Sequence, residues 1–129
     1  MNKSILITAA LFGLLSIVFG AFGAHGLKAL IPYEALQTFE TGVRYQMYHA
    51  LMLLFVGSTT LIKQKTKKIL LYLTIFGVLL FSGSIYCLAT NNLTSFDFKT
   101  IGFITPVGGL LLITSWGFLL INFIKMKIK

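Results

Sequence analysis

The sequence predicts an all-α membrane protein, an up-down bundle of four transmembrane helices. Four apolar stretches carry this prediction: residues 4–24, 43–62, 69–89 and 101–124. Each is close to the roughly 20 residues that a helix needs to cross a hydrocarbon core about 30 Å thick. None contains Asp, Glu or Lys, and the chain is 57% hydrophobic with a mean hydropathy of +0.89. The charged residues gather between and beyond these stretches, so the composition excludes an ordinary soluble domain.

The first stretch follows Lys3 and ends in small residues, a pattern that signal peptides share. Its apolar run is longer than the roughly 15 residues of a signal peptide, which favours a span that is retained. One face carries small residues at intervals of three and four, namely Gly13, Ser16, Gly20 and Ala24. Such stripes let helices approach closely in lipid. The stripe therefore serves either packing within the chain or a homo-oligomer through this face.

The connection to the second stretch, residues 25–42, predicts an amphipathic outer segment between helices 1 and 2. Pro32 suits the first turn of a helix. Apolar residues then recur at helical spacing, at Ala35, Leu36, Phe39 and Val43. We therefore expect a helix on the outer membrane surface that leads into the second span. Glu40 stands four residues before Arg44, the favourable order for an ion pair on one helix face.

The third and fourth stretches are expected to pack as antiparallel neighbours of the earlier ones. Only the six residues 63–68 separate the second stretch from the third, and short loops make neighbouring helices antiparallel. The fourth stretch contains TPVGG at residues 105–109. Pro106 removes a backbone donor, and Gly108 and Gly109 loosen packing, so this motif predicts a helix kink.

The distribution of the lysines predicts the orientation of the chain. The net charge is +8, and most of it lies on one side of the predicted bundle, at Lys3, Lys63, Lys65, Lys67, Lys68, Lys125, Lys127 and Lys129. The other two connections are nearly neutral. The positive-inside rule therefore places both termini in the cytoplasm. We expect membrane lipids as partners of this basic side, and no nucleic acid, because no recognition motif accompanies the charge.

With this orientation, polar residues converge in the outer half of the bundle. The start of the second span supplies Arg44, Tyr45, Tyr48 and His49, and neighbouring segments supply His25, Glu40 and Ser84. A guanidinium offers a planar fork for carboxylate or phosphate, tyrosines add hydroxyl groups, and histidine titrates near neutral pH. The cluster therefore predicts a protein that binds or passes a small anionic solute or a lipid headgroup.

A structural or accessory protein is the alternative. Arg44 can reach toward the interface beside Glu40 while the tyrosines form an aromatic belt, and His49 can hydrogen-bond to Ser84 or to a backbone carbonyl. In that case the cluster only stabilises helix packing.

An enzyme is the least favoured class. The sequence shows no carboxylate pair, no nucleophile beside a histidine and no phosphate-binding loop, so no catalytic residue is assigned. His25, His49 and Cys87 fall short of the four ligands of a closed zinc site. We therefore expect neither metal nor cofactor.

Four motifs in order resemble one family: GAFGAHG at residues 20–26, TGVRYQMYHA at 41–50, FSGSIY at 81–86 and TPVGG at 105–109. They are similar to the small bacterial membrane proteins grouped as domain of unknown function 423, which themselves resemble a eukaryotic transmembrane protein family. The resemblance covers nearly the whole chain. It implies a four-helix integral protein of the bacterial plasma membrane that keeps its first span. It implies no activity.

Overall fold

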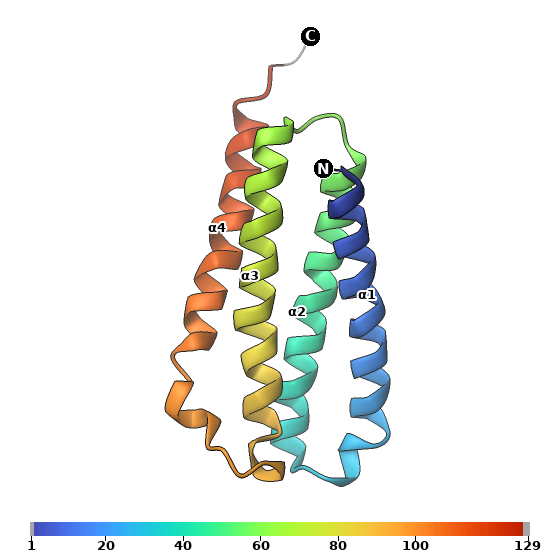
Figure 1. Ribbon diagram of the computed structural model, residues 1–129, viewed down its shortest axis with the longest axis vertical. Coiled ribbons are helices and arrows are strands. Elements are labelled where there is room, and N and C mark those ends of the chain that lie inside the picture. Colours follow the sequence, from blue (N-terminus) through green and yellow to red (C-terminus); the bar gives the residue numbers. More distant parts are fainter. Residues whose placement is uncertain (1, 128–129) are drawn as a thin grey trace.

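The computed structural model describes residues 2–127, which form four long helices packed side by side (Figure 1). These are α1 (Asn2–Ala24), α2 (Tyr33–Ser58), α3 (Gln64–Ala89) and α4 (Ile104–Ile124). Three short 3-10 helices lie in the connections, η1 (Leu27–Ala29), η2 (Asn91–Leu93) and η3 (Phe98–Ile101). The described residues contain no strand. The predicted all-α class is confirmed.

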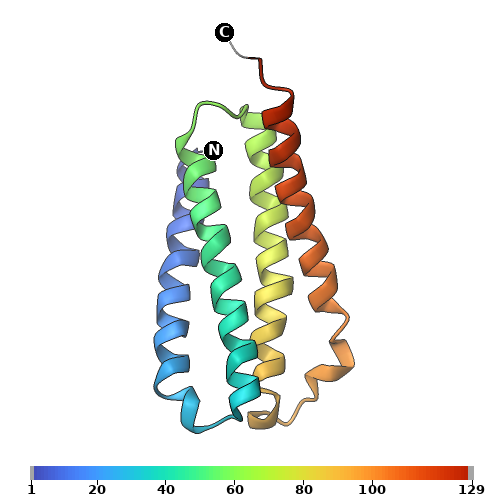
Figure 2. The same ribbon diagram turned by 180° about the vertical axis from the view of Figure 1, so that it is seen from behind.

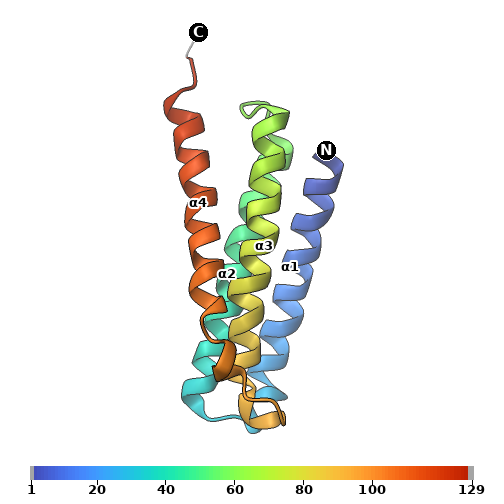
Figure 3. The same cartoon turned by 60° about the vertical axis from the view of Figure 1, so that its left-hand side comes forward.

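Consecutive helices run in opposite directions, so the two ends of the described chain lie at the same end of the bundle (Figure 1). α2 packs against α1 and α3, and α3 packs against α4. Figure 3 shows the same order after a turn of 60°, with α1 and α4 at the two edges and α2 and α3 between them. The up-down order that the short connections predicted is therefore present.

Within residues 2–127, three helices are long and apolar enough to cross a membrane: α1, α3 and α4. In the most apolar windows of α1 and α4 only 22% of the residues are buried, and their exposed side chains include Leu14, Ile17, Leu110 and Ile113. Outward-facing apolar side chains of this kind suit lipid contact. α2 does not reach the same apolar content, because its first half carries the charged residues Glu34, Glu40 and Arg44.

Two groups of buried apolar side chains hold the bundle together. The larger group takes residues from all four helices, among them Ile5, Leu53, Leu70 and Leu119. The smaller group lies at the other end, where η1, α2 and α3 meet, and includes Leu27, Phe39 and Ala89. The second half of α2 thus contributes to the larger group and its first half to the smaller one.

The helix boundaries correct three sequence predictions. α2 runs without a break from Tyr33, so the outer segment is the first part of α2 and not a separate surface helix. Pro32 caps that helix, and no later residue interrupts it. α3 begins at Gln64, so Lys65, Lys67 and Lys68 lie on the helix and not in a loop.

The predicted kink at Pro106 is the third correction. α4 begins at Ile104 and continues unbroken to Ile124. Pro106 therefore lies in the first turn, where the backbone N–H groups have no intrahelical acceptor and proline costs little. Gly108 does not loosen the packing either. A Cβ atom at Gly108 would clash with the backbone of Leu80 and Phe81 on α3, so this glycine allows α3 and α4 to approach closely.

The small-residue stripe of α1 faces α2. A Cβ atom at Gly13 would lie 3.8 Å from Ala50, and one at Gly20 would lie 3.5 Å from Val43. Ser16 is buried, whereas Ala24 is exposed. The stripe therefore serves packing within the chain. A homo-oligomer through this face would require α2 to move away.

Lys67 is the most unexpected core residue, because its side chain is only 1% exposed. Its Nζ donates to Thr59 O at 2.6 Å and to Asn2 Oδ1 at 3.0 Å. Thr59 is the residue after the last turn of α2, where the helix dipole is negative and favours a cation. Lys67 thus joins α1, α2 and α3 at the end of the bundle that holds both ends of the described chain.

We predict that Gly108→Ala lowers the free energy of unfolding by about 1 to 3 kcal/mol, because the added methyl group meets backbone that cannot rotate away. Gly117→Ala on the same helix is the control. A Cβ there would have no neighbour within 4 Å, so alanine should leave stability unchanged or raise it by up to about 1 kcal/mol. Unfolding in a detergent titration measures both, and equal effects would contradict the close approach at Gly108.

Candidate functional site

Gln46 is the centre of the polar cluster, because its side-chain amide links three helices. The side chain is 4% exposed. Its Nε2 donates to Phe12 O on α1 at 2.9 Å, and its Oε1 accepts from the Tyr86 hydroxyl on α3 at 2.7 Å. In a lipid environment such groups need partners from the protein. The Nε2 and the Oε1 of Gln46 each have one such partner.

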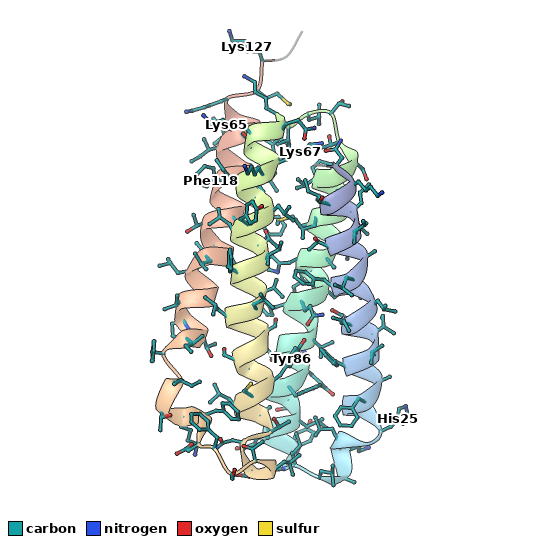
Figure 4. The ribbon with its side chains drawn as sticks, viewed as in Figure 1. His25, Lys65, Lys67, Tyr86, Phe118 and Lys127 are labelled. Carbon is teal, nitrogen blue, oxygen red and sulfur yellow. The ribbon has the colours of Figure 1, made fainter. Side chains whose placement is uncertain are left out.

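Small residues bring α2 and α3 close enough for these bonds. A Cβ atom at Gly42 would lie 2.7 Å from Cε1 of Tyr86, so only glycine leaves room for the tyrosine ring there. The Ser82 hydroxyl donates to Gly42 O at 2.7 Å. The Tyr86 ring is held between Phe19, at 5.2 Å between ring centroids, and Phe39, at 4.9 Å. Figure 4 shows Tyr86 pointing into the bundle between α3 and α2.

His49 connects α2 to α4. It is 3% exposed, its Nδ1 lies 2.6 Å from Tyr45 O, and its Nε2 lies 3.0 Å from the indole Nε1 of Trp116. An indole N–H only donates and a carbonyl only accepts. These partners therefore require the neutral tautomer with its proton on Nδ1. Of the two predicted partners of His49, the backbone carbonyl is present, and Trp116 takes the place of Ser84.

Ser84 belongs to a different contact. Its hydroxyl is hydrogen-bonded to the hydroxyl of Thr105 at the start of α4 and donates to Phe81 O at 3.0 Å. Farther along the same pair of helices, Thr74 and Ser115 share a buried hydrogen bond of 2.9 Å. Ser84 thus helps to join α3 and α4, on a seam separate from His49.

The other residues of the predicted cluster point away from the core. Arg44 is exposed, and its Nη2 donates to Thr41 Oγ1 at 3.0 Å; this bond takes the place of the predicted ion pair with Glu40. Tyr45 and Tyr48 are 39% and 50% exposed, and their rings pack edge to face at 5.4 Å. No other helix lies in front of α2 in the view from behind (Figure 2). Arg44 and Tyr48 therefore lie on an uncovered side of α2, whereas the Tyr45 ring also packs against Phe81 of α3, at 5.1 Å between ring centroids.

Glu40 and His25 lie near the turn between α1 and α2. Glu40 lines a surface hollow of about 450 Å³ together with Lys28, Tyr33 and Gln37, whose Nε2 donates to the Tyr33 hydroxyl at 2.9 Å. His25 stands at the end of α1 and points away from the bundle (Figure 4). The structure thus groups Arg44, Tyr45 and Tyr48 but does not bring His25, His49 and Ser84 to them.

The interior of the site depends on His49, which the sequence analysis assigned to it, and on residues that it did not assign, namely Gln46, Phe12, Tyr86 and Trp116. Gln46 and His49 follow Gly42 at steps of four and three, a spacing that places all three on one helix face. Helical periodicity could have identified that face. The partners Phe12, Tyr86 and Trp116 carry no comparable signal. Within residues 2–127, no three His, Cys, Asp or Glu side chains lie close enough to hold a metal ion.

Comparison with known proteins identifies relatives over the whole chain. The family described as "Protein of unknown function (DUF423)" matches residues 19–109. A UPF0382 membrane protein of Staphylococcus haemolyticus is 40% identical over 126 residues, which cover 95% of this chain and 97% of the relative. The UPF0382 membrane protein YwdK of Bacillus subtilis is 38% identical over 133 residues, with 95% and 98% covered.

A more distant relative is named for its location. The UPF0382 inner membrane protein YgdD of Escherichia coli is 33% identical over 131 residues, which cover 99% of this chain and 95% of the relative. No solved structure matches the chain.

We predict that Tyr86→Phe lowers the free energy of unfolding by about 0.6 kcal/mol, and by no more than about 1.7 kcal/mol, which are the mean and the maximum measured for side-chain hydrogen bonds in one membrane bundle. Gln46→Leu should cost more, because it leaves the Tyr86 hydroxyl and the Phe12 carbonyl without their partner. The double variant should cost less than the sum of the two. Tyr72→Phe is the control on α3, because that ring is 49% exposed. Additive effects would contradict the link between Gln46 and Tyr86.

Proposed function

The chain belongs to the DUF423 family of proteins of unknown function, and we propose that it is an integral protein of the bacterial plasma membrane that binds an anionic lipid headgroup on the uncovered side of α2. In this proposal the exposed residues Arg44, Tyr45 and Tyr48 form the binding face, with Glu40 at its edge. The buried residues Gln46 and His49 hold the helices in place. The polar cluster thus has two halves with different roles.

The exposure of Arg44 is the observation that carries the proposal. Its hydrogen-bond partner within residues 2–127 is the hydroxyl of Thr41, which leaves most of its five donors for a ligand. An arginine costs roughly 2.5 to 3.5 kcal/mol in the middle of a span, and less toward the interface. Arg44 stands eleven residues after the start of α2, about 16 Å along the helix. A phosphate or carboxylate that meets the guanidinium fork would offset that cost.

The same side of α2 changes from polar to apolar along its length. Glu40, Arg44 and Tyr48 follow one another at steps of four, and Leu51 and Phe55 continue the face, with 56% and 44% of their surface exposed. This order matches an amphiphile whose headgroup lies at Arg44 and whose chain follows the leucine and the phenylalanine. It favours a lipid over a small soluble anion.

A structural or accessory protein is the second candidate, and the bonds of Gln46 and His49 favour it. They join all four helices, and removing them would release the bundle. Under this alternative the exposed residues only anchor α2 at the interface. Neither candidate is an enzyme. The partners of His49 are a carbonyl and an indole, and neither is a nucleophile.

We also propose that α2 is the fourth span and that both termini are cytoplasmic. The charged residues of α2 lie in its first half, at Glu34, Glu40 and Arg44. Farther along the helix, Gln46 and His49 are buried among the other helices and are not exposed to lipid. Lys3, Lys65 and Lys125 lie at the end that carries both termini. The positive-inside rule places that end in the cytoplasm.

We predict that Arg44→Gln weakens phosphatidylglycerol binding about tenfold, because a charge-assisted hydrogen bond contributes about 1.5 to 3 kcal/mol. Arg44→Lys should fall in between, since it keeps the charge and loses the fork. Lipid titration of the purified full chain, followed by native mass spectrometry, measures the binding. Phosphatidylcholine is the lipid control, and Lys99→Gln removes one exposed positive charge at the same end.

Two results would contradict the proposal. One is unchanged phosphatidylglycerol binding in Arg44→Gln. The other is a loss of stability in Arg44→Gln without any lipid, which would make Arg44 a packing residue. His49→Ala should behave in that second way, because its bonds are internal.

The orientation is tested separately. In a Cys87→Ser background, Ser95→Cys should react with a membrane-impermeant maleimide added to right-side-out vesicles. Lys65→Cys should react only after the vesicles are opened. Both positions are exposed and lie at opposite ends of the bundle. Labelling of Lys65→Cys alone in intact vesicles would place the termini outside. Labelling of both positions in intact vesicles would exclude an odd number of spans between residues 65 and 95.

A further inference from the structure

A basic hollow lies at the end of the bundle that carries both ends of the described chain. It has a volume of about 600 Å³ and is formed by the last turn of α4, the residues after it and the connection between α2 and α3. Its basic residues are Lys63 from one segment and Lys125 and Lys127 from the other. Figure 4 shows Lys127 and Phe118 on the α4 side of this end.

Hydrogen-bond donors accompany the lysines. Thr66 adds a hydroxyl group to the lining, and Asn122 adds a side-chain amide. The Nδ2 atom of Asn122 is shielded from solvent and has no hydrogen-bond partner within residues 2–127. A ligand in the hollow does not reach this shielded atom, so the groups that the hollow offers to a ligand are three ammonium groups and the Thr66 hydroxyl.

No Asp or Glu side chain of the chain lies near these lysines. The chain has three acidic residues, and Glu34, Glu40 and Asp97 all lie in the first part of α2 or in the connection between α3 and α4, at the opposite end of the bundle. From Glu40 to the end of α2 at Ser58 the helix alone rises about 27 Å. Attraction over such a distance is largely screened.

Lys67 differs from the lysines of the hollow, because its ammonium group has hydrogen-bond partners inside the protein. Its ammonium group is buried and bonded to Asn2 and Thr59. Lys63, Lys125 and Lys127 are exposed instead, and their shared hollow leaves room for an outside anion.

The membrane side of the hollow is apolar. Phe118, Ile121 and Leu61 line it, and between 41% and 53% of the surface of each side chain is exposed. A free phosphate ion would leave this wall in contact with water. We infer that the hollow binds the phosphate group of an anionic phospholipid, with its acyl chains against Phe118 and Ile121. This site lies at the other end of the bundle from Arg44 and does not depend on the function proposed above.

Two triple variants of the full chain, with the same change in charge at the same end of the bundle, test the inference. The pocket variant replaces Lys63, Lys125 and Lys127 with glutamine. The matched control replaces Lys3, Lys65 and Lys68, which are exposed but do not line the hollow. Native mass spectrometry of the purified proteins, titrated with phosphatidylglycerol or phosphatidylcholine, gives the dissociation constants.

We expect the pocket variant to bind phosphatidylglycerol at least about tenfold more weakly and the control to change about twofold or less, because surface lysines contribute only where they reach the headgroup. Phosphatidylcholine binding should stay the same in all variants. Equal losses in both triple variants would show a diffuse surface potential and overturn the inference.

Inorganic phosphate distinguishes a lipid from a free anion. If the ligand is a lipid, phosphate alone should not stabilise the wild type in phosphatidylcholine. If it does, and the pocket variant loses that effect, the ligand of the hollow is a soluble anion and the inference of a phospholipid is wrong. Arg44→Gln separates the two sites. If Arg44→Gln does not weaken lipid binding, the proposed function fails and the inference about the hollow still stands. If the pocket variant does not weaken lipid binding, that inference fails and the proposed function still stands.

Discussion

A buried amide in a membrane bundle needs partners from the protein itself, and Gln46 finds them on two other helices. Its Nε2 bonds to the backbone of α1 and its Oε1 to the Tyr86 hydroxyl of α3. Both bonds require α2 to sit at one height and one rotation relative to its neighbours. Apolar packing alone allows helices in lipid to slide or rotate at small cost. Gln46 therefore fixes the register of the bundle, and His49 extends the same constraint to α4 through Trp116.

This constraint explains why α2 differs in composition from the other helices. In the most apolar windows of α1 and α4 only 22% of the residues are buried. α2 lies between α1 and α3, and its polar residues on the covered side bond to all three neighbours. A helix that carries the polar contacts of a bundle cannot also be the most apolar one. Arg44 lies on the opposite side and takes no part in these contacts, so packing does not explain its presence.

The sequence was sufficient for the helices, their order and the place of the polar cluster, because length, hydropathy and loop size determine these features. It was not sufficient for the division of the cluster. Arg44 and His49 are five residues apart, which turns them about 140° from each other on a helix. Which of the two residues faces the core depends on partners such as Tyr86 and Trp116. The position of these partners along the bundle axis depends on the close approaches at Gly42 and Gly108. The start of α4 was misplaced for a related reason: Pro106 fits a first turn as well as a kink, and hydropathy does not distinguish the two.

The two ends of the bundle balance their charges in different ways. At the end near η1, Lys28 and Glu40 line one hollow, so opposite charges lie close together. At the other end the charged side chains within residues 2–127 are all positive. Among them Lys67 has acceptors inside the protein, one of which is the carbonyl that follows the negative end of α2. Under the proposed orientation that end faces the anionic leaflet, so lipid headgroups are the counterions that we propose for the exposed lysines, and the hollow is the position where three of them converge.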